Sequence, residues 1–370
     1  MMSTISIKKA GTDLGATLEL LLDPFAARMP LAGSSVLIKP NLVEPLPFTT
    51  GQTTNPALVE SIIAWCKARG ARKIAVGEGP SYFQPKTALK ACFLKTGMAT
   101  VAQRQHVPWI LFDEGPFRAF TDYSPRTPAA FSLSEHGFTW DHIINVPVPK
   151  THYLTRVSIA MKNLKGFIKR EDKPSFHHCG TQTINGSVTA LNNLIRPLVN
   201  IVDCTAPTHR NDAFLLAGMD IVATDAVTAS LMGFNPQEIQ TIRLGFEDGL
   251  GEMDLTHIEI TGDDLKDMQM NLEQPACYLR RTFPALTVSA STACSGCLIP
   301  LFSSLRKLEQ EKVQFKNTLC IALGKEPPQH KYKKIIFVGQ CTRPYSADGP
   351  LLTACPPTKE EVFAFLKDNL

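Results

Sequence analysis

Four cysteines near the C-terminus have a spacing that could hold an inorganic group. Cys294 and Cys297 form a C-x-x-C pair in the segment ACSGC, Cys341 follows in GQC, and Cys355 begins CPPT. Each cysteine is expected at the end of a strand or at the start of a helix. A helix N-terminus stabilises the thiolate form of cysteine, which is the form that binds metals. The sequence therefore predicts that these four thiols converge on one site.

Several occupants fit such a quartet. An iron–sulfur cluster takes four cysteine ligands and tolerates wide spacing, so a [4Fe–4S] cluster is the leading interpretation. A structural zinc ion usually uses two tight pairs, and here only one pair is tight, so zinc is the second interpretation. A disulfide is disfavoured because the N-terminus shows no secretory signal. The quartet could also be ordinary thiols, as we expect of the remaining cysteines that act as small buried hydrophobes: Cys66, Cys92, Cys204, Cys277 and Cys320.

A second group of candidate residues follows the strands expected earlier in the chain. Lys39 and Asn41 end the run IKPN, Lys150 and His152 lie in PKTH, and Lys162 and Asn163 follow in MKNLKG. Lysines at strand ends beside a helix N-terminus suit a carboxylate or phosphate. Lys39, Asn41, Lys162 and Asn163 are therefore predicted ligand contacts, and Lys150 and His152 are predicted catalytic residues.

Asp225 and the segment His177–Cys179 complete the candidates. Asp225 lies in an otherwise apolar helical stretch, where a charge is costly unless it is paired, so we expect it to pair with one of the lysines and to belong to the ligand site. The HHC sequence of residues 177–179 is a possible metal pair, although such a triplet more often marks a polar loop. No dinucleotide fingerprint, P-loop, G-x-S-x-G or H-E-x-x-H motif is present.

The elements that must position these residues alternate between strand-like and helix-like. The stretch 34–40 reads as a buried strand, 55–70 as a capped helix and 73–79 as a second strand, which is a βαβ unit with parallel pairing. Helices are also expected at 86–104, 155–166, 182–199 and 220–233. We predict an α/β fold with mostly parallel sheets flanked by helices in a larger N-terminal domain (1–262), a linker (263–279), and a smaller C-terminal α/β domain (280–370).

Composition limits the class of protein. The chain has 370 residues, 44% of them apolar and 19% charged, which is typical of a globular protein. The net charge of +4 is too small to argue for nucleic acid. No apolar run is long enough to span a membrane, so no membrane association and a cytoplasmic location are expected. Partners are expected to be a small anionic molecule or an electron-transfer protein.

The collected motifs resemble the family catalogued as domain of unknown function 362. The resemblance rests on VLIKPN (Val36–Asn41), PKTH (Pro149–His152), KNLKG (Lys162–Gly166) and the long block Leu216–Phe234, and it covers about Ser34 to Gly262. The resemblance implies an iron–sulfur protein with a largely unassigned reaction. The family is in turn similar to the N-terminal part of nickel-dependent lactate racemases. The chain departs from the family in two ways. The family's Gly-rich segment before the long block is replaced by DCTAPTHRND at residues 203–212, and the compact ferredoxin cysteine motif is missing, with the dispersed quartet in its place.

Three functions therefore remain open. The first is a [4Fe–4S] protein that passes single electrons to or from a small anionic ligand or a partner protein. The second is a non-redox isomerase or metal-assisted acid–base enzyme, with His152 as the base and the cysteines in a structural role. The third is a metal- or cluster-handling protein without catalysis.

Overall fold

The computed structural model of the chain describes residues 2–81, 89–177, 183–207, 212–270, 272–290, 292–313, 315, 317–330, 332–347 and 349–369. Contacts divide the chain into two compact units. The first unit comprises Met1–Thr151 and Thr155–Leu272, and the second comprises His152–Leu154 and Glu273–Leu370. Each unit has its own sheet and its own buried core. Among the described residues, no helix combines the length and the apolar character that crossing a membrane requires.

An eight-stranded sheet forms the centre of the first unit. Its strand order is β12-β1-β11-β10-β7-β2-β3-β4, and all neighbours are parallel except that β11 runs antiparallel to β10 and to β1. The predicted α/β fold with a mostly parallel sheet is confirmed. The strands are β1 (Ser3–Lys9), β2 (Ser35–Pro40), β3 (Lys73–Glu78), β4 (Trp109–Leu111), β7 (His142–Val146), β10 (Val199–Cys204), β11 (Phe214–Gly218) and β12 (Ile258–Gly262).

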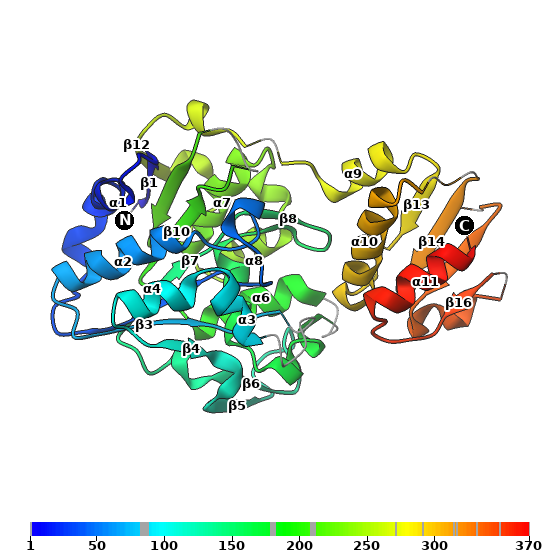
Figure 1. Cartoon of the computed structure of the whole chain (residues 1–370), viewed down its shortest axis with the longest axis horizontal. Helices are drawn as coiled ribbons and strands as arrows, with labels where there is room; N and C mark the ends of the chain where they lie inside the picture. The colour runs from blue at the N-terminus through cyan, green and yellow to red at the C-terminus, as the bar shows by residue number, and fades with distance from the viewer. Residues whose placement is uncertain are drawn as a thin grey trace. The chain divides into compact units, whose positions relative to one another are not determined.

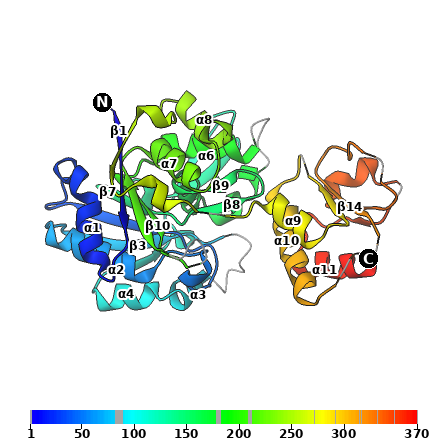
Figure 2. The same cartoon turned by 90° about the horizontal axis from the view of Figure 1, so that it is seen from above.

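Helices cover both faces of this sheet, and Figure 2 shows α1, α2 and α4 on one side and α6, α7 and α8 on the other. Strands buried on both faces read as continuous apolar runs, and all six residues of β2 and of β10 are buried. The helices are α1 (Leu14–Leu22), α2 (Pro56–Ala68), α3 (Leu89–Lys95), α4 (Met98–Arg104), α5 (Ala160–Asn163), α6 (Thr183–Leu194), α7 (Ile221–Leu231) and α8 (Gln240–Glu247).

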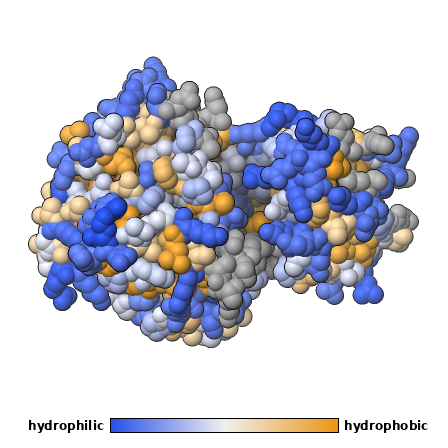
Figure 3. All heavy atoms as spheres, viewed as in Figure 1, coloured by the Kyte–Doolittle hydropathy of each residue, from blue (hydrophilic) through white to orange (hydrophobic). Residues whose placement is uncertain are grey.

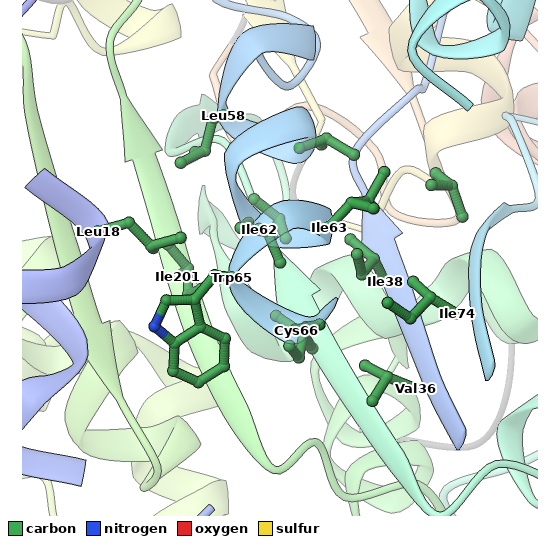
Figure 4. Close-up of a cluster of buried hydrophobic side chains, with 14 of the residues drawn as sticks. Leu18, Val36, Ile38, Leu58, Ile62, Ile63, Trp65, Cys66, Ile74 and Ile201 are labelled. Carbon is green, nitrogen blue, oxygen red and sulfur yellow. The ribbon is translucent and has the colours of Figure 1, made fainter. Parts of the chain in front are cut away.

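Helix α2 illustrates how the sequence builds one of these layers. The Asn55 side chain accepts a hydrogen bond from the Ala57 N–H, and Pro56 occupies the first helical position. Leu58, Ile62 and Trp65 recur at helical spacing. In Figure 4, Ile63 and Cys66 of the same helix lie toward Val36, Ile38 and Ile74 of β2 and β3, whereas Trp65 lies beside Ile201 of β10 and Leu18 of α1. This layer fixes β2 and β3, whose ends carry the polar residues of interest.

Three predicted helices are wrong in extent. The helix predicted at 182–199 ends as α6 at Leu194, and Val199 is the first residue of β10. The stretch 155–166 was predicted as one helix, but Arg156–Ser158 is strand β9, which pairs with β8 (Lys150–His152). Arg156 has a φ of +63°, which a right-handed helix excludes, so α5 begins only at Ala160. Within 86–104, Gly97 has a φ of +85° and separates α3 from α4, and residues 86–88 lie outside the described residues.

Sequence analysis did not predict β1, β11 or the hairpin of β5 (Phe117–Thr121) and β6 (Ala130–Ser134). The polar stretch 263–279 carries a 3-10 helix (Leu265–Met268) and the start of α9 (Pro275–Thr282), and the division between the units falls at Leu272.

The second unit is a four-stranded parallel sheet of order β13-β14-β15-β16 with α10 and α11 packed against each other (Figure 1). Its strands and helices agree with the predicted α/β class, although β16 was not predicted. They are β13 (Leu286–Ser289), α10 (Ser295–Gln310), β14 (Leu319–Leu323), β15 (Ile335–Val338), β16 (Leu351–Leu352) and α11 (Lys359–Asn369). In Figure 3, hydrophilic and hydrophobic residues are mixed over the coloured part of the face shown.

Candidate functional site

The polar centre of the first unit is a cluster of five lysines, which we call the lysine cluster: Lys39, Lys150, Lys162, Lys165 and Lys173. Lys39 is the penultimate residue of β2, and Lys150 begins β8 after β7. Because β2, β3 and β7 are parallel, their carboxyl ends meet at one edge of the sheet. Lys162 and Lys165 lie on α5 and on the 3-10 helix η6 (Leu164–Phe167) that continues it.

Two of the five lysines are paired with carboxylates. Lys39 is 0% exposed, and its Nζ lies 2.9 Å from both Glu78 carboxylate oxygens at the end of β3. Glu78 also accepts hydrogen bonds from the Leu42 and Gly79 N–H groups. Lys173 Nζ lies 3.5 Å from Asp113 Oδ1 and donates to the Gly79 and Pro80 carbonyls. Any effect of Lys39 on a ligand must therefore pass through its neighbours.

Gly166 shows how tightly the chain closes over the Lys39–Glu78 pair. A methyl carbon placed on Gly166 would collide with Glu78 Oε1 and would lie 2.8 Å from Lys39 Cε and 2.9 Å from Lys39 Nζ. Only glycine permits this approach of η6 to the pair. The glycine of the KNLKG segment thus brings the lysines of α5 and η6 to the end of β3.

A chain of asparagine side chains connects the strand ends. Asn41 Nδ2 donates to Asn163 Oδ1 (2.8 Å), Asn163 Nδ2 donates to Asn145 Oδ1 (2.8 Å), and Asn145 Nδ2 donates to Asn200 Oδ1 (2.9 Å). All four are buried. Lys150 Nζ donates to Asn41 Oδ1 and to the Gln52 carbonyl (3.0 Å). The structure therefore brings the predicted residues Asn41, Lys150 and Asn163 together.

The other three lysines have no carboxylate within ion-pair distance among the described residues. Lys150, Lys162 and Lys165 are each partly exposed. Lys162 Nζ makes no hydrogen bond or ion pair within the described part of the chain. Lys165 Nζ lies 2.8 Å from His177 Nε2. The cluster thus carries an excess of positive charge over Glu78 and Asp113.

Burial lowers the pKa values of these lysines. It is the main cause that lowers the pKa of Lys150 to about 7, against which the charge of Glu78 acts. Burial and the neighbouring charge of Lys150 lower the pKa of Lys162 to about 7. Burial, then Lys162 and Lys173, hold the pKa of Lys165 well below its ordinary value. An anion placed among them would favour the charged forms.

The prediction that Asp225 pairs with a lysine is wrong. Asp225 is 2% exposed, and its two carboxylate oxygens accept hydrogen bonds from the Ala160 N–H (2.7 Å) and the Met161 N–H (3.2 Å). These are first-turn amides of α5, which lack partners within the helix. Burial raises the pKa of Asp225 to about 7, and the two amides oppose that rise. Its influence on a ligand would be indirect, through the position of α5.

The two described candidate histidines, His152 and His177, belong to different units. His152 lies in β8 two residues after Lys150, and its Nδ1 accepts a hydrogen bond from the Leu154 N–H (3.1 Å). Residues 152–154 group with the second unit. His177 is 7% exposed and contacts Lys165. His178 and Cys179 of the HHC triplet lie outside the described residues, as do residues 208–211 of the departing loop.

Two glycines of the second unit lie where segments of the cysteine quartet approach one another. A methyl carbon on Gly339 would lie 2.7 Å from Cys297 Sγ and 3.6 Å from Cys341 Sγ. A methyl carbon on Gly296 would lie 3.2 Å from Cys294 Sγ and 3.2 Å from Cβ of Pro356, the residue after Cys355. Each glycine therefore leaves room where the quartet's segments meet.

The thiols also affect one another electrostatically. A hydrogen bond with Cys294 is the largest cause that raises the pKa of the Cys297 thiol, followed by burial and by the charges of Cys294, Cys341 and Cys355. Among the described residues, no three His, Cys, Asp or Glu side chains have the arrangement of a metal-ion site. Of the cysteines predicted as buried, Cys66, Cys92, Cys204 and Cys320 are buried, but Cys277 is exposed on the surface of α9.

Sequence reasoning missed several residues of the first-unit site. Asn145 and Asn200 lie inside the mainly apolar strands β7 and β10. An amide within such a run is a signal that could have found them, because a buried amide needs partners. Lys173 and Asp113 are distant in sequence and no local pattern connects them. Lys165 was noticed as part of KNLKG without a role.

The structure is that of a two-unit α/β protein with a lysine cluster at the strand ends of one unit and neighbouring cysteine-bearing segments in the other. The family model described as "Domain of unknown function (DUF362)" matches residues 36–230, more than half of the chain. The chain belongs to this family.

The chain is also similar to a curated protein in sequence and to a solved structure in fold. The "Thylakoid-associated protein sll1697" of Synechocystis sp. (strain ATCC 27184 / PCC 6803 / Kazusa) is 22% identical over 275 residues, which cover 68% of this chain and 83% of that protein. The lactate racemase apoprotein from Thermoanaerobacterium thermosaccharolyticum aligns with a TM-score of 0.41 at 11% identity, over 59% of this chain and 54% of that chain. The chain thus spans about half of that solved structure.

Proposed function

We propose that the protein is an iron–sulfur redox protein whose second unit holds a [4Fe–4S] cluster on Cys294, Cys297, Cys341 and Cys355. The observation that carries the proposal is the gathering of the quartet's segments at Gly296 and Gly339. Four thiolates are the ligand set of such clusters. When bound, the cluster supplies one-electron transfer at a potential set by burial and by hydrogen bonds to sulfur.

The surrounding chain supports this assignment. Cys294 is the N-cap of the 16-residue helix α10, and Cys297 lies in its first turn. The positive end of a helix dipole favours the thiolate form and the negative charge of a thiolate-bound group. The neighbouring thiols and burial raise the pKa of Cys297, because they disfavour a negative charge there. A bound metal cation would offset that charge and favour the thiolate.

The first unit completes the proposal as the binding site of a small anionic ligand. Lys150 and Lys162 are partly exposed and lack a carboxylate at ion-pair distance among the described residues. Asn41 and Asn163, held by the asparagine chain, offer fixed amides beside Lys150. Electrons would pass to or from this ligand or an electron-transfer partner protein.

Serine substitutions test the ligand assignment one residue at a time. Cys294→Ser, Cys297→Ser, Cys341→Ser and Cys355→Ser should each lower the bound iron and the visible absorption of anaerobically purified protein. Cys277→Ser on the surface and Cys320→Ser in β14 are matched controls and should leave both unchanged. Iron content that does not respond to any quartet variant would overturn the proposal.

A second function is favoured by the lowered pKa values of the lysine cluster. Groups that titrate near neutral pH suit general acid–base catalysis, and the pKa values of Lys150 and Lys162 are lowered to about 7. This alternative is an isomerase-like enzyme with Lys150 and His152 as its catalytic residues and a structural metal, such as zinc, on the cysteines. It predicts zinc without sulfide, and turnover that Lys150→Met abolishes in folded protein.

A further inference from the structure

Lys165 differs from the other members of the lysine cluster in its partner. Its Nζ lies 2.8 Å from His177 Nε2, and this imidazole is its hydrogen-bond partner within the described residues. His177 is 7% exposed, whereas Lys165 is partly exposed. An amine that contacts a buried imidazole, on a side chain that is itself partly exposed, is placed to react, because the imidazole can exchange protons with it.

The surroundings of Lys165 are cationic. Lys162 precedes it by three residues on the same helical segment, and Lys173 lies close enough to act on its charge. The acids of the cluster, Glu78 and Asp113, pair with Lys39 and Lys173 instead. Residues 82–88, 178–182 and 208–211, which lie outside the described residues of this unit, contain no Asp or Glu.

These conditions favour a neutral amine at Lys165. A lysine in a desolvated site beside other cations loses its proton more readily, and a neutral lysine is a nucleophile toward carbonyl carbon. An ordinary lysine with a pKa near about 10.4 presents only a small fraction of neutral amine at pH 7. The lowered pKa of Lys165 supports this geometric argument.

We propose that Lys165 forms an imine with a small aldehyde or ketone that also carries a carboxylate or phosphate group. This inference rests on the proposed anion site of the first unit, and it names the reactive part of the ligand. Lys162 and Lys150 hold the anionic group, and Lys165 attacks the carbonyl carbon. The proposed class of ligand is therefore defined by two chemical groups, an anionic group and a carbonyl group.

The reaction is balanced with the groups present. The Lys165 amine adds to the carbonyl carbon, and the resulting carbinolamine keeps all atoms of both reactants. His177 accepts the proton released from nitrogen at Nε2 and returns it to the hydroxyl group, which leaves as water. The product is a C=N bond on Lys165 Nζ plus one water molecule, without oxidation or reduction. Hydrolysis reverses the same steps.

Reductive trapping with mapping of the modified lysines tests the inference on the full-length protein. The protein is treated with glyoxylate and sodium borohydride at pH 7, and labelled peptides are located by mass spectrometry. Lys169, whose Nζ lies over the Phe117 ring, is the internal control lysine. Lys165 should label at least about tenfold faster than Lys169, because each unit of lowered pKa increases the neutral amine about tenfold.

Two variants test the roles of Lys165 and His177, and three aldehydes test which charged group is recognised. Lys165→Arg should remove the label, and His177→Gln should slow it while keeping a polar partner for Nζ. Native tryptophan fluorescence checks that both variants fold, since Trp65, Trp109 and Trp140 all belong to the first unit. Glyoxylate and glycolaldehyde phosphate are compared with acetaldehyde, which lacks a charge. Faster labelling by one anionic probe identifies carboxylate or phosphate as the recognised group.

The outcomes separate this inference from the proposed anion site. Equal labelling of Lys165 and Lys169 in wild-type protein would overturn the imine, even if calorimetry shows that the unreactive analogue glycolate binds. Selective labelling that acetaldehyde matches would overturn the anionic part of the ligand class. Selective, anion-dependent labelling of Lys165 supports both. Iron and sulfide content tests the cluster separately.

Discussion

At the scale of single residues, the same side-chain type has opposite roles within the lysine cluster. Lys39 is fully buried and paired with Glu78, whereas Lys162 is partly exposed and makes no hydrogen bond or ion pair among the described residues. A buried ion pair costs desolvation and adds little net stability, but losing one partner leaves a buried charge. Lys39 therefore supports the fold, and Lys162 is available to a ligand.

Removing Lys39 alone should destabilise the first unit strongly. We expect Lys39→Met to lower the free energy of unfolding by about 3–5 kcal/mol, because Glu78 remains buried without its partner. The double variant Lys39→Met/Glu78→Gln should recover much of the loss, since it leaves no buried charge and keeps an acceptor oxygen for one of the two amides, Leu42 or Gly79, that donate to the two Glu78 oxygens. Urea unfolding followed by tryptophan fluorescence measures both. Equal losses in the single and double variants would contradict the account.

The lysines with lowered pKa values predict a pH dependence of anion binding. Lys150 and Lys162 have pKa values of about 7, so their charged fractions fall as the pH rises through 7. The affinity for glycolate, whose carboxylate stays ionised, should fall above pH 7 by up to about tenfold per pH unit for each lysine. Calorimetry from pH 6 to pH 9 measures this dependence.

Lys162→Met should make that pH dependence shallower, while the exposed control Lys266→Met should leave it unchanged. The free protein should show the opposite trend in stability. Between the folded pKa of about 7 and the ordinary value of 10.5, the unfolded chain binds more protons, so the unfolding free energy contributed by these lysines rises with pH. A glycolate affinity that is flat across this range would count against the lysines as ligand contacts.

At the scale of elements, the short helix α5 is held by a carboxylate from another helix. Asp225 of α7 accepts hydrogen bonds from the first-turn amides of α5, and Gly166 lets η6 approach Glu78. Sequence analysis recognised β2, the strand that carries Lys39, because its apolar run is continuous. It could not show where α5 begins, because a positive φ at Arg156 and a cap distant in sequence leave no local pattern.

Removing the cap should therefore act on ligand binding from a distance. Asp225→Ala leaves the Ala160 and Met161 amides without an acceptor, which should cost about 1–3 kcal/mol of stability. It should also weaken glycolate binding, because α5 carries Lys162. Asp225→Asn keeps an acceptor and should lose less of both. Tryptophan-monitored unfolding and calorimetry on the same samples provide the test, and unchanged glycolate affinity in a destabilised Asp225→Ala protein would refute the positioning role.

At the scale of the whole molecule, each unit has its own sheet, core and group of chemical residues. The α/β class and most strands were predictable, since parallel βαβ units repeat clearly in the sequence. The edge region formed by β1 and β11 was not, because β1 pairs with strands more than 200 residues away. The asparagine chain and the Lys165–His177 contact also depend on tertiary structure that spacing alone does not encode.

The central claim is that the second unit holds a [4Fe–4S] cluster. Iron, acid-labile sulfide and zinc analysis of anaerobically purified wild-type protein tests it most directly. We predict about four iron and about four sulfide per chain, which the four thiols would hold. Protein with neither iron nor sulfide, or with one zinc and no sulfide, would contradict the claim and favour the acid–base alternative at the lysine cluster.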